Sequence, residues 1–235
     1  MARGVLVPPV TRTRLFATAA YVLLWPVLQL WLSADWWWVE GWLFGLWFLA
    51  VCAACIAWLY RRDPALLAER YRRPGTGGQS RADEFIVYVL LFGFMAWIVL
   101  PPLDAHRFGW TPRMPAWVEG SGAVLLLGAA FFLFRSFSDN PFLSPLVRVQ
   151  PERRQRVVST GVYGLVRHPM YLGASLMFVG GPALLGSAWG LLLGLGLVLL
   201  LIVRIVGEEK LLARELISYE SYRANVRYRL LPYIW

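Results

Sequence analysis

Residues 161–173, GVYGLVRHPMYLG, place an arginine, a histidine and a proline directly before an apolar run that extends to Val206. Ionisable side chains are costly beside hydrocarbon, so Arg167 and His168 are candidates for a functional site. The residue before a proline favours extended geometry, and proline itself suits the first turn of a helix. We therefore expect a helix to begin near Pro169, with free N–H groups that could bind a carboxylate or a phosphate. The alternative is an interfacial anchor without chemistry.

A second candidate group follows that apolar run, in the sequence RIVGEEKLL. Arg204 and Glu208 are four residues apart, so they share a helix face, and Arg204 lies inside the apolar part. The alternative is a simple interfacial salt bridge between them. The tail SYESYRANVRYRLLPYIW adds Tyr219 and Tyr222, three residues apart. Alternatively, the tail is an amphipathic helix on the membrane surface, attracted to anionic lipid by its arginines.

Two further features could suggest other chemistry. Cys52 and Cys55 form a CxxC pair, which can signal a redox or metal site. Two thiols alone make a poor metal site, so we interpret them as small apolar residues on one helix face and predict no metal. The formal net charge is +9. Because no aromatic and basic recognition module accompanies this charge, we predict no nucleic-acid partner, and we predict no obligatory protein partner.

The composition indicates that these residues belong to a membrane protein. Of 235 residues, 58% are hydrophobic and only 16% are charged, whereas a soluble domain has about a quarter charged residues. A spanning helix needs about 20 mostly apolar residues. We predict an all-α, polytopic integral membrane protein with about six transmembrane helices and a C-terminal helical hairpin over 170–206. The predicted helices are 15–33, 37–60, 85–103 (ending at Pro101 and Pro102), 117–137, 170–185 and 188–206.

The basic residues predict an orientation for these helices. All but four of the 23 lysines and arginines lie before the first helix or within 61–81, 148–167 and 210–229, which alternating spans place on one side. Positive charge favours the cytoplasmic side. We therefore expect both termini to be cytoplasmic, with the tail able to fold over the loop 138–169. The basic N-terminus shows no secretory signal peptide, so we interpret the first helix as retained.

Together, residues 161–173, the predicted hairpin, RIVGEEKLL and the tail resemble the isoprenylcysteine carboxyl methyltransferase family, which is related to the phospholipid N-methyltransferases. The resemblance covers about residues 140–235. It implies a bacterial member in the inner membrane, with a cytoplasm-facing pocket for S-adenosylmethionine that opens sideways to the bilayer. Residues 139–235 would then form the methyltransferase core, and residues 1–138 would supply the four N-terminal helices.

The resemblance also implies roles for individual residues. Glu208 would hold a polar part of the cofactor, Arg204 would face the acceptor's carboxylate or other anionic group, and Tyr222 would cover the adenosine. Arg204 and Glu208 are therefore the predicted catalytic residues, and Arg204 is also the predicted substrate-binding residue. The predicted cofactor-binding residues are Gln155, Arg156, Val157, Val158 (a strand-like stretch), Tyr163, His168, Pro169, Met170, Tyr171, Glu208 and Tyr222.

Methyl transfer would suit this small set of polar residues. The reaction is an in-line displacement, so the protein mainly positions donor and acceptor in a dry pocket. A carboxylate acceptor needs no general base, whereas an amine would call for one. We therefore expect a lipophilic acceptor, such as an isoprenylcysteine carboxylate, a lipid or a thiol, reached from the membrane lipids. The alternatives are an NADPH-dependent membrane reductase of the sterol-reductase type and a non-catalytic lipid-binding membrane protein.

Overall fold

The computed structural model describes residues 10–72, 74–75 and 79–235, so the predicted cytoplasmic residues Arg3 and Arg73 lie outside the described part. Within that part the structure is helical and contains no strand, which confirms the predicted all-α class. The stretch 155–158, expected to be strand-like, has no strand partner. The helices are α1 (Arg12–Ser33), α2 (Val39–Arg62), α3 (Pro64–Glu69), α4 (Arg81–Pro101), η1 (Pro102–Arg107), α5 (Ala116–Asp139), η2 (Pro151–Arg153), η3 (Gly161–Gly164), α6 (Pro169–Leu184), α7 (Ala188–Glu215) and α8 (Tyr219–Asn225).

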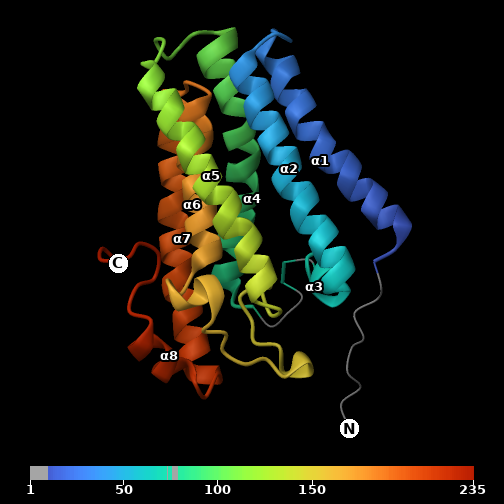
Figure 1. Ribbon diagram of the computed structural model, residues 1–235, viewed down its shortest axis with the longest axis vertical. Helices are drawn as coiled ribbons and strands as arrows, with labels where there is room; N and C mark the ends of the chain where they lie inside the picture. The colour runs from blue at the N-terminus through green and yellow to red at the C-terminus, as the bar shows by residue number, and fades with distance from the viewer. Residues whose placement is uncertain (1–9, 73, 76–78) are drawn as a thin grey trace.

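Five helical segments in the described residues are long and apolar enough to cross a membrane: α1, α2, α4 continued by η1, α5 and α7. The chain is therefore a polytopic membrane protein. Helix α6 is equally apolar but has only 16 residues, fewer than the roughly 20 that a full span requires. It lies beside α5 and α7 in the bundle (Figure 1). The number six stays a prediction.

The α-helix α4 ends at Pro101, within the predicted stop, but the helical segment does not. A stop at Pro101 and Pro102 was predicted, but a π-helix continues the segment to Arg107. Proline lacks the amide hydrogen of a regular α-turn, and a wider π-turn is one way in which a helix accommodates the missing bond. The continuation positions the buried Asp104, whose carboxylate accepts a hydrogen bond of 2.6 Å from Ser187 Oγ at the start of α7.

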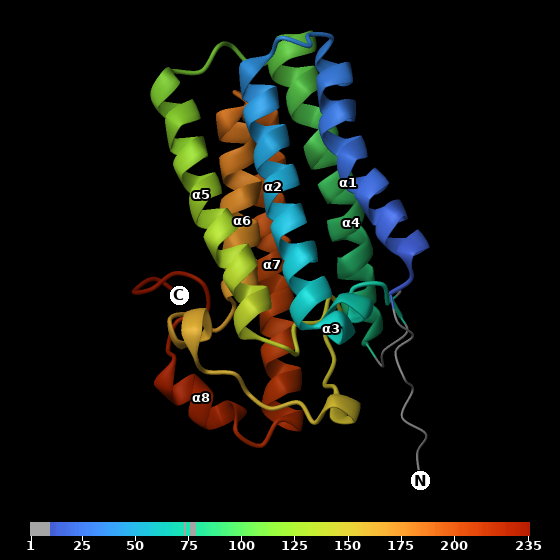
Figure 2. The same cartoon turned by 45° about the vertical axis from the view of Figure 1, so that its right-hand side comes forward.

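Helix α7 also runs further than predicted, to Glu215 rather than Val206. The hydropathy boundary marks where the chain leaves the apolar layer, but glutamate, lysine and leucine are good helix formers on either side of it. The last turns of α7 therefore project beyond the apolar bundle. They carry Glu208 and Glu209 to the same end of the molecule as α3, α8 and the loop 140–168 (Figures 1 and 2). We call this end the basic pole.

Glycines allow the helices around α6 to pack closely. A Cβ at Gly122 of α5 would overlap the backbone of Gly180 and Leu184 in α6. Trp97 of α4 is 1% exposed and donates an Nε1 hydrogen bond of 3.0 Å to the main-chain oxygen of Phe178 in α6. Small residues at helix contacts are typical of membrane bundles because they let backbones approach. The short α6 is thus fixed against α4 and α5.

We expect Gly122→Ala to lower the free energy of unfolding by about 1–3 kcal/mol, because the backbones of α5 and α6 must move apart. Gly120→Ala is the matched control: it lies on the same helix, and an added Cβ there meets nothing within 4 Å. The thermal unfolding midpoints of both variants in detergent measure the effect. Equal midpoints would show that the α5–α6 contact does not require glycine at this position.

Candidate functional site

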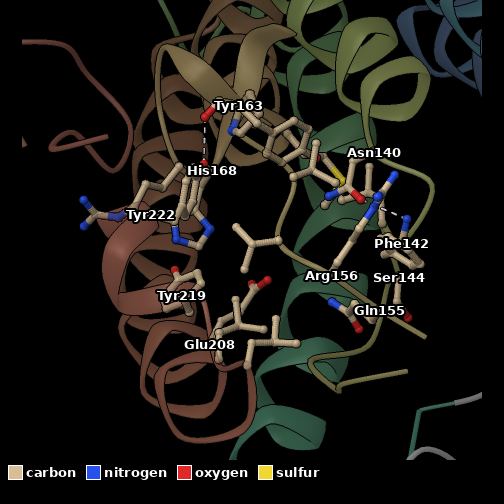
Figure 3. A pocket seen from close by; sticks show the side chains of 18 of the residues that line it. Asn140, Phe142, Ser144, Gln155, Arg156, Tyr163, His168, Glu208, Tyr219 and Tyr222 are labelled. Carbon is tan, nitrogen blue, oxygen red and sulfur yellow. Dashed lines mark hydrogen bonds between the residues drawn. The ribbon is translucent and has the colours of Figure 1, made fainter. Parts of the chain in front are cut away.

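A cavity at the basic pole encloses about 800 Å³ of empty space, including the part open to solvent at its mouth. Figure 3 shows Asn140, Phe142, Ser144, Gln155 and Arg156 on one side of it, and Tyr163, His168, Glu208, Tyr219 and Tyr222 on the other. The first side comes from the loop after α5, and the second comes from η3, the start of α6, the end of α7 and α8.

All eleven residues predicted to hold the cofactor line this one cavity, from Gln155 in the loop to Tyr222 in α8. The sequence prediction omitted several other lining residues, among them Asn140 and Tyr219. Tyr219 had a readable signal, because it lies three residues before Tyr222 and therefore shares its helix face. Asn140 had none, because a lone asparagine after an apolar helix is common. The predicted Arg204 does not line the cavity.

The start of α6 is arranged as the His-Pro pair suggested. His168 is in a non-helical conformation with φ −125°, and the helix begins at Pro169, which confirms the predicted break. The backbone N–H groups of Arg167 and His168 donate to the main-chain oxygens of Tyr228 and Arg229, at 2.9 and 3.0 Å. These two hydrogen bonds attach the segment that contains Tyr228 and Arg229 to the residues that precede α6, and they hold those residues in place.

The backbone just before Tyr163 packs closely against Asp139, and this contact requires a glycine at position 161. Gly161 has φ +61°, a conformation that L side chains rarely adopt, and a Cβ there would overlap the carboxylate of Asp139. That carboxylate, at the end of α5, accepts a hydrogen bond of 3.0 Å from the N–H of Val162. The close approach of residues 161–162 to Asp139 positions the short helix η3, which presents Tyr163 to the cavity.

Three buried tyrosines supply hydroxyl groups to the cavity wall. Burial raises the pKa values of Tyr163, Tyr219 and Tyr222 above the ordinary tyrosine value, so their hydroxyls stay protonated at neutral pH. Tyr222 donates to the main-chain oxygen of Tyr163 at 2.8 Å, which attaches α8 to η3. The buried hydroxyl of Tyr219 has no partner among the described residues. Buried polar groups are normally satisfied, so a bound molecule or water is the expected partner.

The two consecutive glutamates of α7 face different surroundings. Glu208 lines the cavity and accepts a hydrogen bond of 2.7 Å from the hydroxyl of Tyr171. Glu209 is 4% exposed, and its carboxylate contacts two arginines and a histidine: Arg167 at 2.6 Å, Arg229 at 2.8 Å and His168 at 3.3 Å. Neighbouring residues on an α-helix point about 100° apart, which separates the pair.

Sequence reasoning assigned no site role to Glu209. The only signal available was the doublet itself, since two adjacent glutamates cannot serve the same face of a helix. In the structure Glu209 connects Arg167 and His168, at the entrance to α6, with Arg229 in the terminal segment. It therefore holds together the two chain segments that form one wall of the cavity.

The predicted couple of Arg204 and Glu208 is not formed. Arg204 is 7% exposed, and its Nε donates to Asp83 Oδ1 of α4 at 2.9 Å, while Nη2 donates to the main-chain oxygen of Pro145 at 2.7 Å. The spacing rule considers one helix only, but a buried guanidinium needs a nearby counter-charge, and α4 supplies a closer one. Arg204 thus joins α7 to α4 and to the cavity loop, and its position gives no support to direct contact with an acceptor.

We expect Asp83→Ala and Arg204→Ala each to lower the free energy of unfolding by about 3–5 kcal/mol, since each leaves a buried charge without its partner. The double variant should cost clearly less than the sum of the two, because it removes both charges together. Unfolding midpoints of the four proteins measure this coupling. Additive losses would show that the two side chains do not interact.

Within the described residues, no group of three or more histidine, cysteine or acidic side chains is arranged to hold a metal ion. Cys52 and Cys55 are free thiols on α2. The cavity instead offers one carboxylate at Glu208, guanidinium groups at Arg148 and Arg156, and tyrosine hydroxyls. These groups can hold a small molecule that carries both positive and negative charge.

The similarity to known proteins is concentrated on the part of the chain that builds this cavity. A family model described as phospholipid methyltransferase matches residues 120–217, which include most of α5, the cavity loop, α6 and α7. Lamin-B receptor of Drosophila melanogaster is 29% identical over 108 residues. That match covers 44% of this chain and 15% of the receptor, so the chain corresponds to only a small part of that relative.

Proposed function

We propose that this protein is an integral membrane methyltransferase that transfers a methyl group from S-adenosylmethionine to a lipophilic acceptor. The observation that carries the proposal is the cavity at the basic pole: most of its lining residues fall within the segment that the phospholipid methyltransferase model matches. Eleven residues assigned to a cofactor from the sequence meet around it.

The residues of the cavity fit the proposed cofactor. S-adenosylmethionine supplies an electrophilic methyl group on a positively charged sulfur, together with an ammonium, a carboxylate and an aromatic base. Glu208 faces the cavity with a single hydrogen bond, from Tyr171, and no ion pair among the described residues, so its charge is available to a positive group. Tyr219 offers an unpartnered hydroxyl. Arg156 can bind a carboxylate.

The chain's own contribution would be positioning and the exclusion of water. Helix α8 contributes Tyr219 and Tyr222 to the cavity, and the bond from Tyr222 to Tyr163 attaches it there. Glu209 orients His168 through its Nε2 atom. Holding two reactants in a fixed geometry can supply a large part of a displacement reaction's barrier reduction. A carboxylate or thiolate acceptor needs no residue to remove a proton, which agrees with the small number of bases in the cavity.

We further propose that the acceptor arrives from the membrane lipids, as a lipid, a thiol or a carboxylate such as that of isoprenylcysteine. The basic pole would lie in the cytoplasm of a bacterial cell, because lysine and arginine favour that side of the membrane. Cofactor would then enter from the cytoplasm and acceptor from the bilayer.

The proposal is tested by incubating the purified protein with membrane lipid extract and methyl-labelled S-adenosylmethionine. We expect label in a lipid-soluble product, and saturable binding of S-adenosylhomocysteine to the protein in detergent. Boiled protein is the control for non-enzymatic transfer. If S-adenosylhomocysteine does not bind, the assignment of the cavity to this cofactor is wrong.

A second candidate is an NADPH-dependent membrane reductase of the sterol-reductase type. The similarity to lamin-B receptor favours it, although it covers under half of this chain. Parallel titrations with NADPH and S-adenosylhomocysteine separate the two candidates. Binding of NADPH alone would replace the methyltransferase proposal with this one.

A further inference from the structure

The outward face of α7 changes from apolar to cationic within two helical turns. Leu199, Val203 and Val206 are 63%, 57% and 38% exposed, which is the pattern of a helix face directed at lipid tails. Lys210 and Arg214 continue the same face at spacings of four residues, and both are exposed. In a membrane, such a change marks the level at which hydrocarbon gives way to headgroups.

A groove lies at this level, between α7 and α8. Its lining includes Val206, Lys210 and Arg214 of α7, Arg223 of α8, and Arg229 of the terminal segment. It encloses about 800 Å³ of space, part of it open to solvent. A second hollow of about 720 Å³ adjoins it and shares Arg223 and Arg229; Arg227 and Arg167 add two further cations to its lining. We call the two hollows together the α7–α8 groove.

Of the cations that line the groove, Arg167 and Arg229 pair with the buried Glu209, and the other four have no buried carboxylate partner among the described residues. Lys210, Arg214 and Arg227 form no ion pair with any described residue. Arg223 contacts only Glu220, at 3.1 Å, and the Glu220 side chain is 66% exposed, so water weakens this pair. The groove therefore has an excess of positive charge where a lipid headgroup would lie.

The groove is separate from the cavity of the proposed methyltransferase site. Glu208 lines the cavity, whereas Glu209, the next residue of α7, lines the groove. Among the described residues, Arg167 alone lines both the cavity and a hollow of the groove. Binding in the groove therefore does not depend on which cofactor the cavity holds.

We propose that the α7–α8 groove binds the phosphate of an anionic phospholipid from the surrounding membrane, with the acyl chains along Val206, Val203 and Leu199. The cations bind the headgroup, and the apolar face that continues from the groove accommodates the chains. This continuity favours a lipid over a free anion, because a soluble phosphate would gain nothing from the adjoining apolar face.

The experiment is native mass spectrometry of the full chain in detergent, with added phosphatidylglycerol or phosphatidylcholine. Each basic residue near a membrane surface contributes about fivefold to binding of an anionic lipid. We therefore expect Lys210→Gln/Arg214→Gln to weaken phosphatidylglycerol binding by about 25-fold and to leave phosphatidylcholine binding unchanged. The matched control is Arg61→Gln/Arg62→Gln, which removes two exposed arginines at the basic pole, at the end of α2.

The proposal is supported if phosphatidylglycerol binding falls in the first double variant, Lys210→Gln/Arg214→Gln, and not in the second, Arg61→Gln/Arg62→Gln. Equal losses in both pairs would show general attraction to a basic surface and would overturn it, as would unchanged binding in the first pair. Competition with inorganic phosphate separates the two sources of the anion: displacement at millimolar phosphate would assign the groove to a soluble anion. Thermal unfolding without lipid verifies that both double variants are folded.

Discussion

Replacing Glu209 with alanine should lower the free energy of unfolding by about 3–5 kcal/mol, because it leaves buried cations without their counter-charge. Arg167, at 7% exposed, loses its only carboxylate partner and His168 loses its nearest one. Arg229 loses the contact that binds the terminal segment to α7. We also expect weaker binding of S-adenosylhomocysteine, since His168 and the neighbouring cavity wall are then free to move. Thermal unfolding and ligand titration measure the two effects.

Two variants show whether charge or mere volume is responsible. Glu209→Gln keeps the shape and one acceptor oxygen, so it should recover part of the stability but little of the ion pairing. Glu215→Ala removes an exposed glutamate from the last turn of the same helix, where no ion pair is formed in the described structure, and should change stability by less than about 0.5 kcal/mol. If Glu209→Ala unfolds at the same temperature as Glu215→Ala, the buried network does not stabilise the fold.

Replacing Glu208 with glutamine should weaken ligand binding and leave the free energy of unfolding nearly unchanged. Its side chain lines the cavity with one hydrogen bond, from Tyr171, which a glutamine oxygen can still accept. Stability without ligand should therefore change little. Affinity for S-adenosylmethionine should fall by about tenfold to hundredfold, since a hydrogen bond to a charged group contributes about 1.5–3 kcal/mol.

The comparison of two ligands sharpens this prediction. S-adenosylmethionine has a positive sulfur that S-adenosylhomocysteine lacks, so the loss in Glu208→Gln should be larger for the first ligand if the carboxylate lies near the sulfur. Glu215→Gln is the control for a change of net charge at the same pole. Unchanged affinity for both ligands would remove Glu208 from the proposed site, while leaving the role of Glu209 in the fold untouched.

Much of the architecture could be predicted from local sequence because the responsible forces act locally. A long apolar run must be helical in a membrane, since every backbone polar group needs a partner there. Pro169 fixes the start of α6 because the residue before it cannot easily be helical, and the structure has the break at that point. The predicted stop at Pro101 and Pro102 holds for the α-helix, but a π-helix continues the segment to Arg107, which the prolines did not indicate.

The candidate site could be predicted in part for the same reason. Tyr163, His168 and Tyr171 lie close together in the sequence, and the short turn between α6 and α7 brings the far end of α7 back beside them. The cavity's lining therefore followed from spacing and resemblance. Asn140 and Tyr219 complete the lining; the spacing of Tyr219 from Tyr222 indicates a shared helix face, but nothing in the immediate sequence of Asn140 shows what it faces.

The partners of the buried charges were decided by the tertiary structure alone. The sequence identified Arg204 and Glu208 as a pair, yet Arg204 binds Asp83, which precedes it by 121 residues, and Glu209 binds Arg167, 42 residues away. Helical periodicity can place two residues on one face of one helix, but a buried ion takes the nearest carboxylate in space, from whichever helix packs there. The sequence by itself determined the helices and the segments that meet at the basic pole. Packing determined that Glu208 faces the cavity while Glu209 holds its wall.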